Sequence, residues 1–245
     1  MTRLALALAA IFFALPAAAA EPSPRYDACM DLARKDPLEG IKDAIAWRKQ
    51  GGGVMADHCL ATGLVARGDY AEGAQLLQEI AAEDWPARTR AGLYSQAGRA
   101  WISAGEDRKA WGALTDGLAA DPDSTDLLVD RAIANAALGL NFEAIDDLDR
   151  ALDLAPRRAD ALVLRASAWR RAGNLDLASD DVDRALAVQS KNVDALLERG
   201  NIYSTRGNIA AARADWIAVL QLEPNGPSAE VARQNLEKVD VRDKR

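Results

Sequence analysis

An internal repeat of 34 residues constrains the fold of this chain more than any other feature of its sequence. Segments 124–157, 158–191 and 192–225 align without gaps. Self-similarity at such a period is typical of proteins that stack one small structural unit repeatedly. The recurring columns are Leu128/Leu162/Leu196, Arg131/Arg165/Arg199, Ala132/Ala166/Gly200, Gly139/Gly173/Gly207, Ala144/Ala178/Ala212 and Asp147/Asp181/Asp215. A further copy precedes them with Tyr94, Gly98, Trp101, Gly105, Ala110, Leu114 and Pro122.

One copy predicts two short helices. Helix A is expected over about 125–138, and Gly139 can adopt the left-handed conformation that ends it. Helix B is expected over about 141–154 and stops before Pro156, because proline disfavours helix in the residue before it. A pair this short cannot bury its apolar face alone, so it must stack on the next copy.

The pattern resembles the tetratricopeptide repeat. The resemblance covers 91–225 and implies an all-α fold, a right-handed α-solenoid of about five to six helix hairpins. It departs from the family at Asn135, where an aromatic residue is usual, and at Ser190, where proline is. The residues that carry it are Leu128, Ala132, Gly139, Ala144, Ala151 and Pro156.

The two ends of the chain follow the repeat less closely. Segment 21–90 is predicted to form degenerate helix pairs, one of which has Gly73 in place of the usual alanine. Segment 91–225 then holds four regular repeats. Segment 226–245 is expected to form a capping helix and a frayed tail that begins at Asp240.

The first twenty residues have the pattern of a secretory signal. Arg3 provides a short basic region, 4–15 is apolar, and Ala18 and Ala20 fit the small residues before a cleavage site. The apolar stretch is shorter than the roughly 20 residues that a membrane span needs. We therefore expect export to the bacterial periplasm, cleavage after about Ala20, and no membrane insertion of the mature chain.

The charge balance excludes two classes of partner. The chain has 37 acidic and 30 basic residues and a formal net charge of -7. Nucleic-acid binding needs a concentrated basic face, and so does attachment to an anionic membrane surface. We therefore expect a protein partner.

Cys29 and Cys59 are the only cysteines. An even pair in an exported protein predicts one disulfide, and successive A helices lie side by side in the architecture that the resemblance implies. The alternative is a small metal- or thiol-dependent site at Cys29, His58 and Cys59. No C-x-x-C or H-x-x-x-H spacing supports it, and neighbouring side chains on a helix diverge by about 100°. We therefore favour the disulfide and expect no metal or cofactor.

The arginine column predicts structural ion pairs. Each arginine precedes an aspartate by 16 positions. The two upstream copies have neither the arginine nor the aspartate, and one of them has Ala97 and Ala113 at these positions. An ion pair between helices A and B predicts that a copy has both residues or neither. The pairs are Arg131 with Asp147, Arg165 with Asp181, and Arg199 with Asp215.

The sequence contains no combination of base, nucleophile and oxyanion donor, so we expect no enzymatic activity. The resemblance implies a concave groove, lined by A helices, that binds a peptide or a helix of a partner. Val129, Val163 and Leu197 occupy positions where a chaperone-tail clamp needs polar groups, so a partly apolar ligand is favoured. The expected lining is Asp126, Val129, Ile133, Asp160, Val163, Ser167, Arg170, Asp194, Leu197 and Asn201.

The sequence thus predicts a non-catalytic periplasmic adaptor that binds another envelope protein. A self-associating structural protein is a second alternative. Trp85 lies in an irregular insertion and is expected as an exposed contact. The tryptophans expected in the core are Trp47, Trp101, Trp111, Trp169 and Trp216.

Overall fold

The computed structural model describes residues 23–243, which form thirteen helices and no strand. The signal predicted for 1–20 lies outside this part. None of the described helices is both long and apolar enough to cross a membrane. The helices are α1 Pro24–Lys35, α2 Pro37–Lys49, α3 Gly53–Arg67, α4 Tyr70–Ala81, α5 Ala87–Ser103, α6 Asp107–Ala120, α7 Thr125–Ala137, α8 Asn141–Leu154, α9 Ala159–Arg171, α10 Leu175–Val188, α11 Val193–Thr205, α12 Ile209–Leu222 and α13 Pro227–Asp243.

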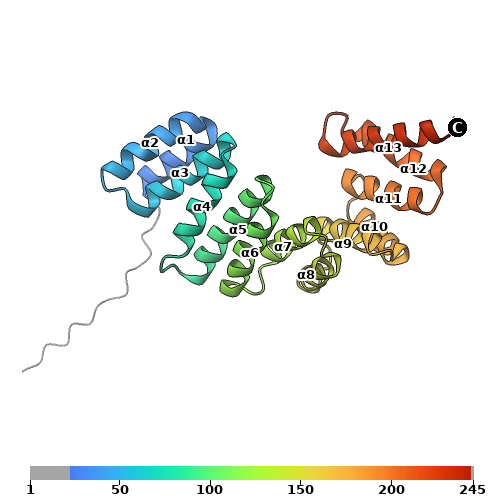
Figure 1. Cartoon of the computed structure of the whole chain (residues 1–245), viewed down its shortest axis with the longest axis horizontal. Helices are drawn as coiled ribbons and strands as arrows, with labels where there is room; N and C mark the ends of the chain where they lie inside the picture. The colour runs from blue at the N-terminus through green and yellow to red at the C-terminus, as the bar shows by residue number, and fades with distance from the viewer. Residues whose placement is uncertain (1–22, 244–245) are drawn as a thin grey trace, which may run out of the picture.

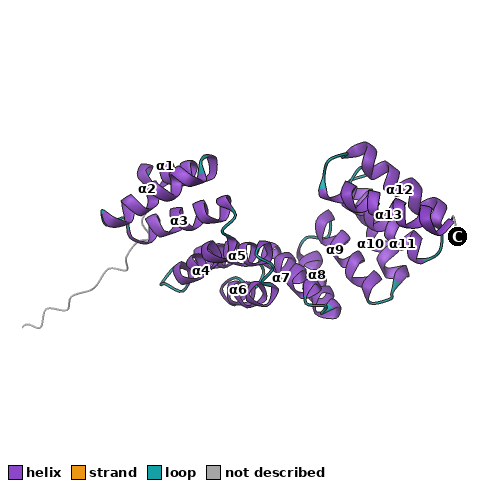
Figure 2. Cartoon of the chain, turned by 45° about the horizontal axis from the view of Figure 1, so that its top comes forward, coloured by secondary structure: helices purple, strands orange, loops and turns teal. Residues whose placement is uncertain are grey.

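Helices α1 to α12 form six antiparallel hairpins, and α13 packs on the last of them. The hairpins follow one another along an open arch (Figure 1). The odd-numbered A helices α5, α7 and α9 lie toward the inside of the arch, and the even-numbered B helices α6 and α8 lie outside. A second view shows the same serial arrangement of helices joined by short loops (Figure 2). The expected all-α solenoid is confirmed.

A glycine ends each of the A helices α3, α5, α7, α9 and α11 by turning the chain into helix B. The five glycines have φ between 73° and 99°, a region that L-residues with a side chain avoid. After α7, the amide of Leu140 donates to the carbonyl of Asn135 at 2.9 Å, which satisfies one of the helix's free carbonyl groups. The repeat of this residue therefore fixes where each hairpin bends.

Close packing between helices A and B depends on small residues opposite large ones. A Cβ added to Gly98 would lie 2.5 Å from Leu114, and one added to Gly200 would lie 2.6 Å from Nε1 of Trp216. Gly73 has the same role, because its Cβ would meet Val65 at 2.6 Å. The degenerate repeat thus has Gly73 in place of alanine because Val65 fills the space that a Cβ would need.

The boundaries of α13 correct one prediction. The capping helix does not stop at Val239 but continues to Asp243. Val239 is 4% exposed and packs in a cluster with Trp216 and Val219, and Asp240 forms an ion pair with Arg213. A contact with the last hairpin therefore holds Asp240, the first residue of the tail that we expected to be frayed.

Two tryptophan predictions are wrong. Trp111 is 41% exposed, because Ala110, Ala113 and Leu114 fill the buried face of α6 and the intervening position points elsewhere. Trp85 is only partly exposed: it packs against the main core, and its Nε1 donates to the carbonyl of Ile80 at 2.7 Å. Among the others, Trp101 and Trp216 are buried, and Trp47 and Trp169 are half-buried against core clusters.

The predicted disulfide is confirmed. Cys29 of α1 and Cys59 of α3 are bonded, with their Cα atoms 6.0 Å apart and both side chains inaccessible to solvent. The bond lies in a small core of its own with Met30, Leu60 and Leu64. It therefore holds the first hairpin to the second, in the part of the solenoid where the repeat pattern is weakest.

Replacing Cys29 and Cys59 together by alanine is expected to destabilise this end of the solenoid selectively. Closing a loop of 30 residues stabilises by about 3–4 kcal/mol in the chain-entropy model. Hydrogen exchange should show that loss in α1–α3 and little change in α7–α12, because repeat arrays open locally. Reducing the wild-type protein should give the same pattern. Equal loss along the whole chain would contradict the local role.

Candidate functional site

Three buried ion pairs join helices A and B in the regular repeats. Each guanidinium donates two hydrogen bonds to one carboxylate, with N–O distances of 2.6 to 2.9 Å. The aspartate side chains are 5–9% exposed. Two parallel bonds fix the angle between the groups as well as their distance. The structure thus brings together Arg131 and Asp147, Arg165 and Asp181, and Arg199 and Asp215.

Two of these arginines also reach the preceding repeat, which the sequence did not indicate. Arg165 of α9 donates to Asp149 of α8 at 2.5 Å, and Arg131 of α7 donates to Thr115 of α6 at 3.4 Å. The carboxylate of Asp181 is the main cause that raises the pKa of Arg165. Each of these two arginines therefore connects its own hairpin to its neighbour.

Asn135 replaces an aromatic residue because it serves the same polar network. Its side chain is 2% exposed, and its amide donates to Asp147 at 3.0 Å. In the upstream copy without the ion pair, Ala97 and Ala113 are both fully buried. At the positions of the ion pair, the helices there carry small apolar side chains instead.

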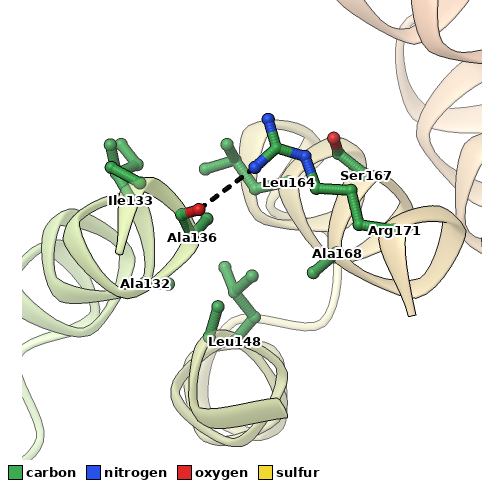
Figure 3. A pocket seen from close by; sticks show the side chains of 10 residues that line it. Ala132, Ile133, Ala136, Leu148, Leu164, Ser167, Ala168 and Arg171 are labelled. Atoms are coloured by element: carbon green, nitrogen blue, oxygen red, sulfur yellow. Dashed lines mark hydrogen bonds between the residues drawn. The ribbon is translucent and has the colours of Figure 1, made fainter. Parts of the chain in front are cut away.

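The inner surface of the arch has a pocket between α7 and α9, with a volume of about 270 Å³. Ala132 and Leu148 form its floor, Ile133 and Leu164 face each other from its two walls, and Arg171 crosses its mouth (Figure 3). The guanidinium of Arg171 donates to the carbonyl of Ala136 at 3.1 Å. This pocket is mainly apolar with one basic group at its opening.

Two more pockets occupy equivalent positions. One lies between α3 and α5 and measures about 300 Å³, and the other lies between α11 and α13 and measures about 340 Å³. In the first, Val65 and Leu77 supply apolar surface and Gln96 and Arg99 are the larger polar residues. In the second, Trp216 and Val231 are apolar, and the polar residues are Arg170, Asn201, Ser204, Thr205, Asn235 and Lys238.

The structure distributes the expected groove residues among different surroundings. Ile133 and Ser167 line the α7/α9 pocket, and Arg170 and Asn201 line the α11/α13 pocket. Val163 and Leu197 are half-buried against core clusters. The remaining acidic residues are partnered: Asp126 and Asp160 pair with Arg158, and Asp194 accepts from Ser228.

Val129 was wrongly expected to line the groove. Its side chain is 4% exposed and belongs to the main core, because Val129 faces the packed side of α7 together with Leu128. Leu164 and Arg171 were missed. Comparing the repeat columns could have found Leu164, because the same column holds Gln96, Asp130 and Glu198 in the other copies.

His58 links three A helices beside the disulfide. The Tyr26 hydroxyl lies 2.8 Å from Nδ1, and Nε2 lies 3.1 Å from Oε1 of Gln96. A neutral ring that accepts at Nδ1 and donates from Nε2 satisfies both bonds. Burial is the main cause that lowers the pKa of His58, and the bond to Gln96 partly offsets it.

The alternative site at Cys29, His58 and Cys59 loses its chemistry in this arrangement. The disulfide leaves neither sulfur as a thiolate, which is the form that attacks a substrate or binds a metal. Within residues 23–243, no group of three or more His, Cys, Asp or Glu side chains is placed to hold a metal ion.

Solved structures share this arrangement of hairpins. MamA from Desulfovibrio magneticus RS-1 is 16% identical over 71% of this chain and 97% of its own, with a TM-score of 0.60. YrrB, described as a TPR protein with an unusual peptide-binding site, is 17% identical over 77% and 96%, with a TM-score of 0.54. Human IFIT1, solved as a dimer with PPP-AAAA, is 17% identical over 89% and 54%, with a TM-score of 0.65.

These likenesses show the fold: the chain is an α-solenoid of the tetratricopeptide-repeat type. The sequence matches no protein-family model and no curated protein. One of the similar folds is described with a peptide-binding site and another with PPP-AAAA, so the fold alone does not choose a ligand.

A double-mutant cycle with Arg165→Leu and Asp181→Leu should reveal strong coupling. Either single variant removes the partner that makes two hydrogen bonds to the remaining charge, and Asp181 then keeps only Arg184, whereas the double variant leaves apolar groups in place of both. Each single change is expected to cost about 3 kcal/mol in unfolding free energy, and the double change less than the sum. Asp149 remains as a second partner of Arg165. Asp181→Leu should therefore lower the unfolding free energy less than the loss of an only partner would. Additive losses would contradict the pairing.

The pKa of His58 predicts that stability falls in mild acid. Because burial lowers this pKa below the value of 6.5 in the unfolded chain, the unfolded state binds the proton first. Unfolding free energy should therefore decrease as the pH falls through about 6.5 and further through the folded-state pKa. His58 is the only histidine, so His58→Gln should remove this decrease in urea titrations between about pH 7.5 and pH 5.5. An unchanged slope in the variant would contradict the assignment.

Proposed function

We propose that this protein is a non-catalytic interaction scaffold of the bacterial periplasm that binds a segment of another envelope protein in the groove formed by its A helices. The pockets between successive A helices carry this proposal, because each offers apolar surface and a few polar groups on a preformed face. The fold supports it, since a helical solenoid presents an extended concave surface suited to a chain rather than to a small substrate.

The proposed location rests on two features. The first twenty residues have the pattern of a secretory signal, and the buried disulfide between α1 and α3 is of the kind that persists in oxidising compartments. The net charge of -7 favours a protein partner over nucleic acid or an anionic membrane.

Photo-crosslinking tests which face of the solenoid binds. A photoreactive phenylalanine analogue at Ile133 lies on the wall of the α7/α9 pocket. The matched control is the same analogue at Phe142, which is 61% exposed on α8 outside the arch. In an envelope extract, we expect a specific adduct from position 133 and none from position 142, with both proteins folded by circular dichroism.

Adducts only from position 142, or from neither position, would contradict the proposed function. An adduct with a second copy of this chain would instead favour the self-associating structural protein, and light scattering would then show a larger mass for the purified protein.

A further inference from the structure

The A-helix surface alternates in chemistry from one interface to the next. Between α5 and α7, Asp130 accepts from Arg99 at 2.7 Å, and burial raises the pKa of Asp130 while Arg99 opposes that rise. Between α9 and α11, Glu198 accepts from Arg170 at 2.5 Å. These two interfaces are bridged by ion pairs. In the repeat between them, Leu164 occupies the column of Asp130 and Glu198, so the ion pair of that column is missing between α7 and α9. Among the ion pairs of the described residues, only that of Arg158 with Asp126 joins these two helices, at their first turns.

The three pockets lie at the interfaces that alternate with these bridges, α3/α5, α7/α9 and α11/α13. They are therefore spaced by two repeats along the solenoid. Packed helices are about 8–10 Å apart, so neighbouring pockets are separated by about 16–20 Å. An extended chain rises about 3.3 Å per residue and covers this distance in about five to six residues.

The charged residues that line the pockets are all basic, although the chain as a whole is acidic. Arg99 lines the first, Arg171 the second, and Arg170 and Lys238 the third. Arg171 makes one hydrogen bond, to a backbone carbonyl, so its charge is not neutralised by a carboxylate. Lys238 is exposed at the pocket between α11 and α13. The α7/α9 pocket thus combines an apolar cavity with a guanidinium that no carboxylate neutralises, and the α11/α13 pocket combines Trp216 and Val231 with the exposed Lys238. Arg99 of the α3/α5 pocket is already paired with Asp130.

On the basis of the proposed function, we propose that the groove binds an extended segment with apolar side chains about five to six residues apart, each beside an acidic residue. The apolar side chains enter the pockets, and the carboxylates pair with Arg171 and Lys238. We take the ligand as extended rather than helical, because the helices that hold the pockets follow a curved arch (Figure 1), and an extended chain can bend along it more easily than a straight helix.

A displayed library of random peptides of about 20 residues, long enough to reach all three pockets, provides the probe. We expect selection against the disulfide-bonded protein to enrich Asp or Glu beside Leu, Ile, Phe or Met at the stated spacing. Synthetic peptides from the selection, labelled for fluorescence anisotropy, then allow the affinity to be compared among variants.

Two groove variants and two matched controls locate the binding. Ala136→Leu fills the α7/α9 pocket, and Arg171→Glu reverses its charge. Ala210→Leu and Arg108→Glu make the same changes at exposed positions of the B helices α12 and α6. We expect about tenfold weaker binding for the two groove variants and a change below about twofold for the controls. Ser167→Leu serves as the filling variant if Ala136→Leu does not fold.

Replacing Glu or Asp by Lys in the selected peptides should abolish binding, and inserting four residues between the two apolar positions should weaken it. Enriched peptides without acidic residues, affinity that is insensitive to spacing, equal losses in the controls, or no enrichment at all would overturn this inference. Groove-dependent binding of peptides with another pattern would overturn it while leaving the proposed function intact. Crosslinks that come only from Phe142 would remove the proposed function itself.

Discussion

Stacking of helix hairpins is the constraint on which the rest of this structure depends. No single hairpin buries its own apolar face, so each must present one surface to the preceding copy and another to the next. The hydrophobic effect provides the stabilisation, and the opposition of glycine or alanine to a large side chain lets the helices approach. Gly200 against Trp216 is one example, since any side chain at that glycine would collide with the indole. The inner surface of the arch exists because this stacking repeats from one hairpin to the next.

The polar groups add orientation to that packing. Arg165 binds Asp181 in its own hairpin and Asp149 in the preceding hairpin. It therefore orients the two helices of its hairpin and also the hairpin relative to its neighbour. The same strategy closes the groove at Arg99–Asp130 and at Arg170–Glu198. Where the column holds Leu164 instead, the α7/α9 interface has an apolar pocket. One residue of the repeat therefore distinguishes this interface from the two that ion pairs bridge.

The sequence predicted the structural features that the repeats share. It did not predict the burial of single side chains that differ from one copy to the next. The hairpins, the ion pairs and the disulfide follow from columns or counts that a single sequence displays. Burial of Val129 did not follow, because the family's groove pattern does not say how far helix α7 is rotated against its neighbours. Exposure of Trp111 depends on which face of α6 is turned toward the core, and the ion pair of Asp240 depends on Arg213 of the last hairpin. The pockets were missed because they lie between copies, where no single repeat contains the whole site.

The central claim is that ligands bind on the A-helix side of the arch, in pockets that the helix stacking creates. Methyl NMR of the isoleucine side chains tests it most directly, because Ile133 lines the α7/α9 pocket, whereas Ile217 is 43% exposed on helix α12 and is not among the residues that line the three pockets. On addition of a bound peptide, the account predicts a shift of the Ile133 methyl signal and an unchanged Ile217 signal. A shift of Ile217 with Ile133 unmoved would contradict it.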